Sequence, residues 1–139
     1  MSIKTTESGT TLRNRLNKSI VLAIRELMGQ KTPDTNSLDM AAYVVLALEK
    51  IAESVDRSAE AWEKRDYWLK ADQFRQEYLW IEPSLMALKP AVIAQDWTIL
   101  VPALVQVAQR LKNVQIAQNH RIGTPWVGAR DLLLKTLKS

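Results

Sequence analysis

The sequence lacks cysteine altogether and has little glycine, proline or histidine: four, five and one of 139 residues. Without cysteine, disulfide bonds, thiolate metal sites and thiol nucleophiles are excluded. The scarcity of glycine and proline, with no alternating strand pattern, predicts an all-α protein. The longest apolar runs, residues 41–48 and 99–105, are well short of the ~20 residues that span a bilayer. We therefore expect no membrane association.

The sequence lacks the residues that several kinds of catalytic site require. A di-iron bundle needs Glu-x-x-His on two helices, but His120 is the only histidine and Ala117 stands three residues before it. No serine has the sequence context of an activated nucleophile, and there is no glycine-rich phosphate loop. His120 itself is expected at the end of a helix. The prediction is a protein that is not an enzyme, with no catalytic residue and no cofactor.

Length and composition predict a single domain. A chain of 139 residues, 47% apolar and 24% charged, is ordinary for a globular protein with one core. Residues 1–10 are polar and lack the apolar segment of a secretory signal. We predict a flexible polar tail over residues 1–10, one helical domain over residues 11–139, and a soluble, cytoplasmic protein.

The fold class predicted from hydrophobic periodicity is all-α, a helical bundle of four to five helices with one long central helix. Thr10 or Thr11 is expected to cap the first helix, Gly29 to end it, and Asp96 to cap a later one. Thr124 and Pro125 are typical of a helix start and should open the last helix. The predicted helices cover residues 11–28, 37–82, 84–94, 96–118 and 126–137.

The long central segment, residues 37–82, contains no glycine or proline. As one helix it would be roughly 65–70 Å long, whereas a compact domain of this size has a radius of gyration of only ~14 Å. It must therefore kink or break near residues 54–58, or project and be covered by another copy of the chain. Apolar residues keep helical phase across the doubtful region, which favours one continuous or mildly bent helix.

Residues 61–80 hold six of the nine aromatic side chains, with four basic and four acidic residues among them. The rings fall on two or three faces of a helical wheel, which indicates several neighbours. Balanced charge disfavours a platform for stacking nucleic acid bases. We predict that this stretch is an interface for a homodimer or another protein partner. The interface residues are Trp62, Tyr67, Trp68, Phe74, Tyr78 and Trp80.

Five carboxylates share one face of the central helix, and they must be solvated, paired or bridged by a cation. A magnesium site for a hydrolase is one hypothesis, since Mg²⁺ prefers oxygen ligands. No second acidic cluster accompanies the stripe, so a solvated face, or one docked against the basic terminal helices, is the favoured interpretation. The acidic stripe consists of Glu49, Glu53, Asp56, Glu60 and Glu63.

The last part of the chain is basic: residues 83–139 carry seven basic and two acidic groups. An alternative function is therefore a nucleic-acid-binding or regulatory module. The turn at residues 122–125 resembles that of a helix-turn-helix, but the last helix has few side chains that read base edges. The candidate phosphate-binding residues are Arg110, Lys112, Arg121, Arg130 and Lys135.

Overall fold

The computed structural model describes residues 7–137, and within that range the chain forms helices and no strand. In chain order its six helices are α1 (Gly9–Met28), α2 (Thr35–Glu63), α3 (Trp68–Glu77), α4 (Ile81–Ala94), α5 (Trp97–Arg110) and α6 (Ala129–Leu137). Five of the six helices pack around a shared core, and α3 packs against α2, which confirms the predicted all-α bundle.

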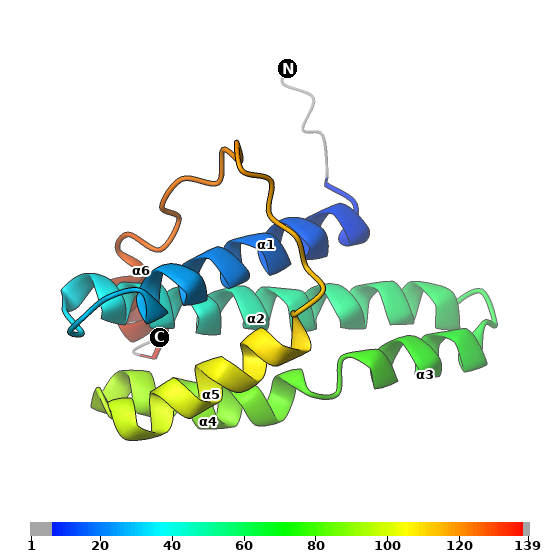
Figure 1. Ribbon diagram of the computed structural model, residues 1–139. Helices are drawn as coiled ribbons and strands as arrows, with labels where there is room; N and C mark the ends of the chain where they lie inside the picture. Colours follow the sequence, from blue (N-terminus) through cyan, green and yellow to red (C-terminus); the bar gives the residue numbers. More distant parts are fainter. Residues whose placement is uncertain (1–6, 138–139) are drawn as a thin grey trace, which may run out of the picture.

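The long helix α2 is the centre of the bundle, packing against α1, α3, α4 and α6 (Figure 1). Helices α3 and α4 run back beneath α2 one after the other, and α5 returns alongside α4. Apolar faces from all these helices except the short α3 meet in a core where many side chains have no exposed area. Examples are Ile20, Val44, Leu48, Leu88, Leu100 and Leu133. None of the helices in residues 7–137 has the length and apolar character needed to cross a membrane.

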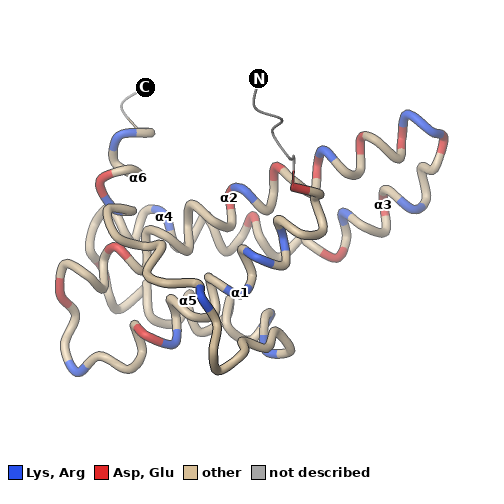
Figure 2. The backbone as a smooth tube through the Cα atoms, turned by 90° about the horizontal axis from the view of Figure 1, so that it is seen from above, with Lys and Arg blue, Asp and Glu red and all other residues tan. Residues whose placement is uncertain are grey.

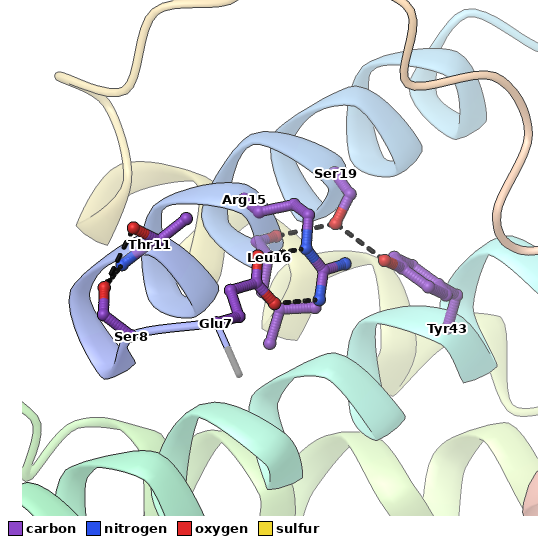
Figure 3. A network of polar contacts seen from close by, with 7 residues as sticks. All are labelled: Glu7, Ser8, Thr11, Arg15, Leu16, Ser19 and Tyr43. Atoms are coloured by element: carbon purple, nitrogen blue, oxygen red, sulfur yellow. Dashed lines mark hydrogen bonds and ion pairs between the residues drawn. The ribbon is translucent and has the colours of Figure 1, made fainter. Parts of the chain in front are cut away.

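Helix α1 begins two residues before the predicted start. The Ser8 side chain caps it by accepting a hydrogen bond from the backbone N–H of Thr11 (3.1 Å), and Gly29 ends it as predicted. A bidentate ion pair between Glu7 and Arg15 folds the preceding residue onto the helix (Figure 3). The domain therefore includes residues 7–10 of the predicted tail; residues 1–6 lie outside the described part of the chain.

The central part of α1 is tied to α2 by a buried hydroxyl. Ser19 donates its hydroxyl proton to the carbonyl of Leu16 (2.8 Å), and its oxygen lies 2.7 Å from the hydroxyl of Tyr43 on α2 (Figure 3). A buried hydroxyl is costly when it has no hydrogen-bond partner, so these contacts remove that cost. They also fix the position of α1 along α2.

The long central helix is shorter than the predicted range of residues 37–82. It continues unbroken through residues 54–58 and ends at Glu63, where the chain reverses over residues 64–67. Asp66 adopts φ 63°, a left-handed conformation that Asp tolerates better than most residues, and the N–H of Tyr67 bonds the carbonyl of Trp62 (2.9 Å). The reversal lets α3 pack back against α2, so the segment satisfies the size limit of a compact domain without projecting as one rod.

Helices α4 and α5 form an antiparallel pair whose start differs from the prediction. Helix α4 begins at Ile81, three residues before the predicted start, and Pro83 occupies its first turn, where a missing N–H costs nothing. Asp96 caps α5 as predicted, accepting from the backbone N–H of Thr98 (3.2 Å). However, α5 ends at Arg110, not at residue 118. Val114 and Ile116 both pack against the core, although residues two apart point to different sides of a helix. An extended segment lets both side chains reach the core.

Helix α6 is held in place by a carboxylate that is distant in sequence. Asp39 in the first turns of α2 accepts hydrogen bonds from the backbone N–H groups of Gly128 (3.1 Å) and Arg130 (3.0 Å). Free N–H groups at a helix start need such acceptors. The helix therefore begins at Ala129, three residues later than predicted, and the buried Trp126 lies in the preceding turn.

Candidate functional site

The six predicted interface residues fall on one structural unit. We call residues 62–80, from the last turn of α2 through α3 to the start of α4, the aromatic hairpin. Its two arms lie side by side and extend beyond the rest of the bundle, and both signs of charge alternate along them (Figure 2). The hairpin brings the six residues into one region but gives them different roles.

Three of the rings hold the hairpin together from inside. The rings of Trp62 and Phe74 meet edge to face with centroids 4.9 Å apart, and Phe74 meets Tyr78 in the same way at 5.3 Å. Such pairs contribute roughly 0.5–1.5 kcal/mol beyond the area they bury. Ala71, which is fully buried, lets α3 approach α2 closely. These half-buried rings are therefore part of the packing between the two arms.

An ion-pair clamp closes the hairpin beside the rings. The guanidinium of Arg75 on α3 donates two hydrogen bonds to the carboxylate of Glu63 on α2, at 2.8 and 3.2 Å, and lies 3.8 Å from Asp56. These hydrogen bonds lower the pKa of Glu63 below its ordinary value, and Glu63 in turn raises the pKa of Arg75. Bidentate pairing fixes geometry as well as charge, so the clamp sets the register of α3 on α2.

A buried arginine that was not predicted as a functional residue supports the hairpin from α1. Arg13 donates to the hydroxyls of Ser54 (2.8 Å) and Ser58 (3.2 Å), while its guanidinium lies 4.8 Å from the centre of the Phe74 ring. A Cβ at Gly9 would lie 2.9 Å from Nη1 of this arginine, so the glycine leaves room for it. Arg13 precedes Leu16 by three residues, which places it on the apolar stripe of α1 and is the signal that could have revealed it.

Three consecutive side chains at the far end of the hairpin face solvent. Tyr67 is 53% exposed, Trp68 61% and Leu69 71%; we call these three residues the hairpin tip. Trp80, by contrast, is half-buried and packs against the bundle core. The cationic groups of Arg65 and Lys70 lie over the rings of Tyr67 (5.8 Å) and Trp62 (4.7 Å) respectively. The tip thus combines exposed apolar area with polar groups around it.

The acidic stripe is largely paired, but with other helices than expected. Glu63 and Asp56 contact Arg75 of α3, and Glu49 accepts from Lys89 of α4 (2.9 Å). Glu53 lies 3.8 Å from Arg57 on its own helix. The contacts of the stripe with other helices are therefore with α3 and α4, not with the terminal helices. Among residues 7–137 no group of three or more acidic or histidine side chains is placed to hold a metal ion.

The five basic candidates for nucleic acid binding lie on separate segments. Arg110 ends α5, Lys112 and Arg121 lie in the connection over residues 111–128, and Arg130 and Lys135 belong to α6. Four of them are exposed, while Arg130 is half-buried. The expected turn at residues 122–125 is part of that long connection, whereas a helix-turn-helix joins its helices by only three or four residues.

His120 lies in the same connection and not at a helix end. Its Nδ1 accepts a hydrogen bond from the backbone N–H of Ile122 (3.3 Å). With Arg25 and Glu26 of α1, it borders a cavity of about 590 Å³. The predicted position of His120 at a helix end was wrong, because α5 ends at Arg110 and not at residue 118.

Comparison of the chain with protein-family models, with curated proteins and with solved structures finds no match.

Proposed function

We propose that this chain is a non-enzymatic, cytoplasmic interaction or assembly protein that associates with itself through the aromatic hairpin. The observation that carries the proposal is the hairpin tip, where Tyr67, Trp68 and Leu69 are each more than half exposed. Tryptophan and tyrosine are enriched at the centres of protein interfaces, because they bury a large area at little cost in side-chain entropy. A second copy would shield this area from water.

The contacts that hold the hairpin tip in place favour binding. The inner rings, the clamp between Glu63 and Arg75, and the buried Arg13 hold the two arms together. A contact surface that is already ordered loses less conformational entropy when a partner binds. The polar groups of Lys64, Arg65 and Asp66 in the adjoining turn would form the rim of such an interface.

The alternative, nucleic acid binding by the basic residues of the last part of the chain, has weaker support. Those residues are spread over α5, the connection and α6, so they do not share one helix face. Titration of labelled DNA and RNA at two salt concentrations tests it, since phosphate contacts weaken steeply with salt. Binding at low salt that weakens at the higher salt concentration would favour this alternative.

Sedimentation of the protein at tens of micromolar tests the assembly proposal. The double variant Trp68→Ser, Leu69→Ser should raise the dissociation constant of self-association about 30-fold or more. This factor corresponds to a loss of about 2 kcal/mol of binding free energy, which is typical of replacing a residue at the centre of an interface. The matched control is Val127→Ser, which changes a side chain that is 70% exposed but lies far from the tip in the chain. A strict monomer, or a double variant that associates as the unaltered chain does, would contradict the proposal.

A further inference from the structure

A cleft of about 300 Å³ lies where α1, α2 and the segment leading into α6 meet. Its volume is at the lower end of the range for small-molecule sites. Two of its apolar side chains face water, since Val127 is 70% exposed and Leu132 55%. We call it the α6 cleft, and its apolar lining consists of Leu16, Leu46, Ala47, Pro125, Val127 and Leu132.

The walls of the α6 cleft are held in place by hydrogen bonds. The contact between Ser19 and Tyr43 fixes α1 on α2 (2.7 Å). Asp39 fixes the third wall, because it accepts from the backbone N–H groups of Gly128 and Arg130 at the start of α6. A site whose walls are already ordered loses less conformational entropy when a ligand binds. The cleft therefore has the order that a small-molecule site needs.

The charged side chains of the α6 cleft are cations. Arg15 and Lys50 line it, and among residues 7–137 no acidic side chain does. Glu7 pairs with Nε and Nη2 of Arg15, which leaves the N–H groups of Nη1 available to an acceptor. Figure 3 shows the guanidinium between Glu7 and Tyr43, and Tyr43 also lines the cleft. Lys50 is exposed and belongs to none of the ion pairs within residues 7–137.

The two cations lie near the same part of the cleft. Arg13 and Ser19, on either side of Arg15 in α1, contact the two ends of residues 43–54 in α2. Interpolation between these two contacts places Arg15 opposite the turn of α2 that contains Lys50. Two neighbouring cations repel each other, and an anion bound between them removes that cost.

The carboxylate of Asp39 does not neutralise this part of the cleft. Eleven residues separate it from Lys50 on α2, which is roughly 16 Å along the helix axis. Both of its oxygens already accept hydrogen bonds from the start of α6. The cleft therefore has a positive region beside Lys50 and an apolar region beside Val127 and Leu132.

We infer that the α6 cleft binds a small monocarboxylate with an apolar chain, of the kind of a medium-chain fatty acid. The carboxylate accepts from Lys50 and Arg15, and the chain covers Val127 and Leu132. An inorganic anion would leave this apolar area exposed, and a neutral hydrocarbon would leave Lys50 without a partner. The inference is independent of the aromatic hairpin, because the cleft is built from other parts of the chain.

Calorimetric titration with hexanoate, octanoate and decanoate tests the apolar part of the site. Lengthening the chain by two CH₂ groups should lower the dissociation constant about ten-fold, until the cleft is filled. The neutral analogue 1-octanol should bind more weakly than octanoate. Absence of octanoate binding at millimolar concentration, or equal binding of 1-octanol and octanoate, would overturn the inference.

The variant Lys50→Gln tests the positive region. It should raise the dissociation constant of octanoate about five-fold and leave that of 1-octanol unchanged, because only octanoate is charged. Lys50 is exposed, so helix content measured by circular dichroism should not change. Arg57→Gln is the matched control, since it removes another exposed cation of α2 that does not line the cleft. Equal loss of octanoate affinity in the two variants would contradict the role of Lys50.

The variant Leu132→Ser tests the apolar lining, and the hairpin double variant tests the location. Leu132→Ser should weaken octanoate and 1-octanol alike, about ten-fold. Trp68→Ser, Leu69→Ser should bind octanoate as the unaltered chain does. Loss of octanoate binding in the double variant, with binding retained in Leu132→Ser, would assign the ligand to the hairpin tip and overturn the inference. Binding of the chain to phosphatidylglycerol vesicles but not to octanoate would assign the surface to a membrane instead.

Discussion

At the scale of single residues, one buried cation connects three helices. Arg13 of α1 reaches Ser54 and Ser58 of α2 and lies over the ring of Phe74 in α3. Among residues 7–137 the ion pairs of the structure do not include it, so its charge is met by hydroxyl oxygens and an aromatic face. A buried charge without those partners would be costly. The position of α3 therefore depends on a residue that is distant in sequence.

Replacement of that residue should weaken the whole bundle. Arg13→Ala removes hydrogen bonds to a charged group and a cation–π contact and leaves a void, so we expect the free energy of unfolding to fall by about 2 kcal/mol. Urea denaturation followed by circular dichroism measures the change. Arg15→Ala, two residues along the same helix, is the matched control and should cost much less, because its ion pair with Glu7 is at the surface. Equal losses in the two variants would contradict the role given to Arg13.

At the scale of helices, the clamp between α2 and α3 makes the hairpin sensitive to acid. The pKa of Glu63 is lowered in the folded chain by hydrogen bonds from Arg75. A carboxylate whose pKa is lowered by folding contributes its full stabilisation above the ordinary glutamate pKa of about 4.3. That stabilisation is lost as the pH falls through the lower pKa of the folded state.

The pH dependence can be assigned to this pair by substitution. We expect the unfolding free energy of the unaltered chain to fall more steeply between pH 5 and pH 3 than that of Glu63→Gln, whose side chain does not titrate. Urea titrations at each pH measure both. The variant Glu7→Gln removes the other carboxylate whose pKa is lowered, and so shows how much of the slope belongs to α1. Parallel curves for Glu63→Gln and the unaltered chain would contradict the assignment.

The helices themselves were predicted from local signals, and the errors arose where distant contacts decide. Asp96 and Gly29 mark the ends of α5 and α1 as predicted, because capping is a property of neighbouring residues. The reversal after Glu63 has no glycine or proline to signal it. It depends on contacts such as that between Trp62 and Phe74, twelve residues apart, which no local pattern reveals.

The sequence shows that six aromatic residues lie in one segment, but not which of them are exposed. The division between inner rings and exposed tip depends on the reversal after Glu63. Which sides of α5 are covered was not predicted for a similar reason: Val101 lies in the apolar run over residues 99–105, yet it is 36% exposed. Which side of an apolar helix is covered depends on its neighbours, not on its own sequence.

At the scale of the whole molecule, the proposed contact at the hairpin tip would join copies in pairs, because a two-fold contact uses the same patch on both copies. Light scattering should then show a dimer as the largest species of the unaltered chain as its concentration rises. The double variant Trp68→Ser, Leu69→Ser should shift this equilibrium toward the monomer. Species larger than a dimer would contradict a contact confined to the hairpin tip.

The attachment of α6 has a consequence for how the chain folds during synthesis. Asp39 bonds the backbone of Gly128, 89 residues later, so α6 reaches α2 only after the five preceding helices have left the ribosome. Contacts of such high sequence separation form slowly. Until then, the side of α2 that α6 covers stays open to chaperones and to other nascent chains.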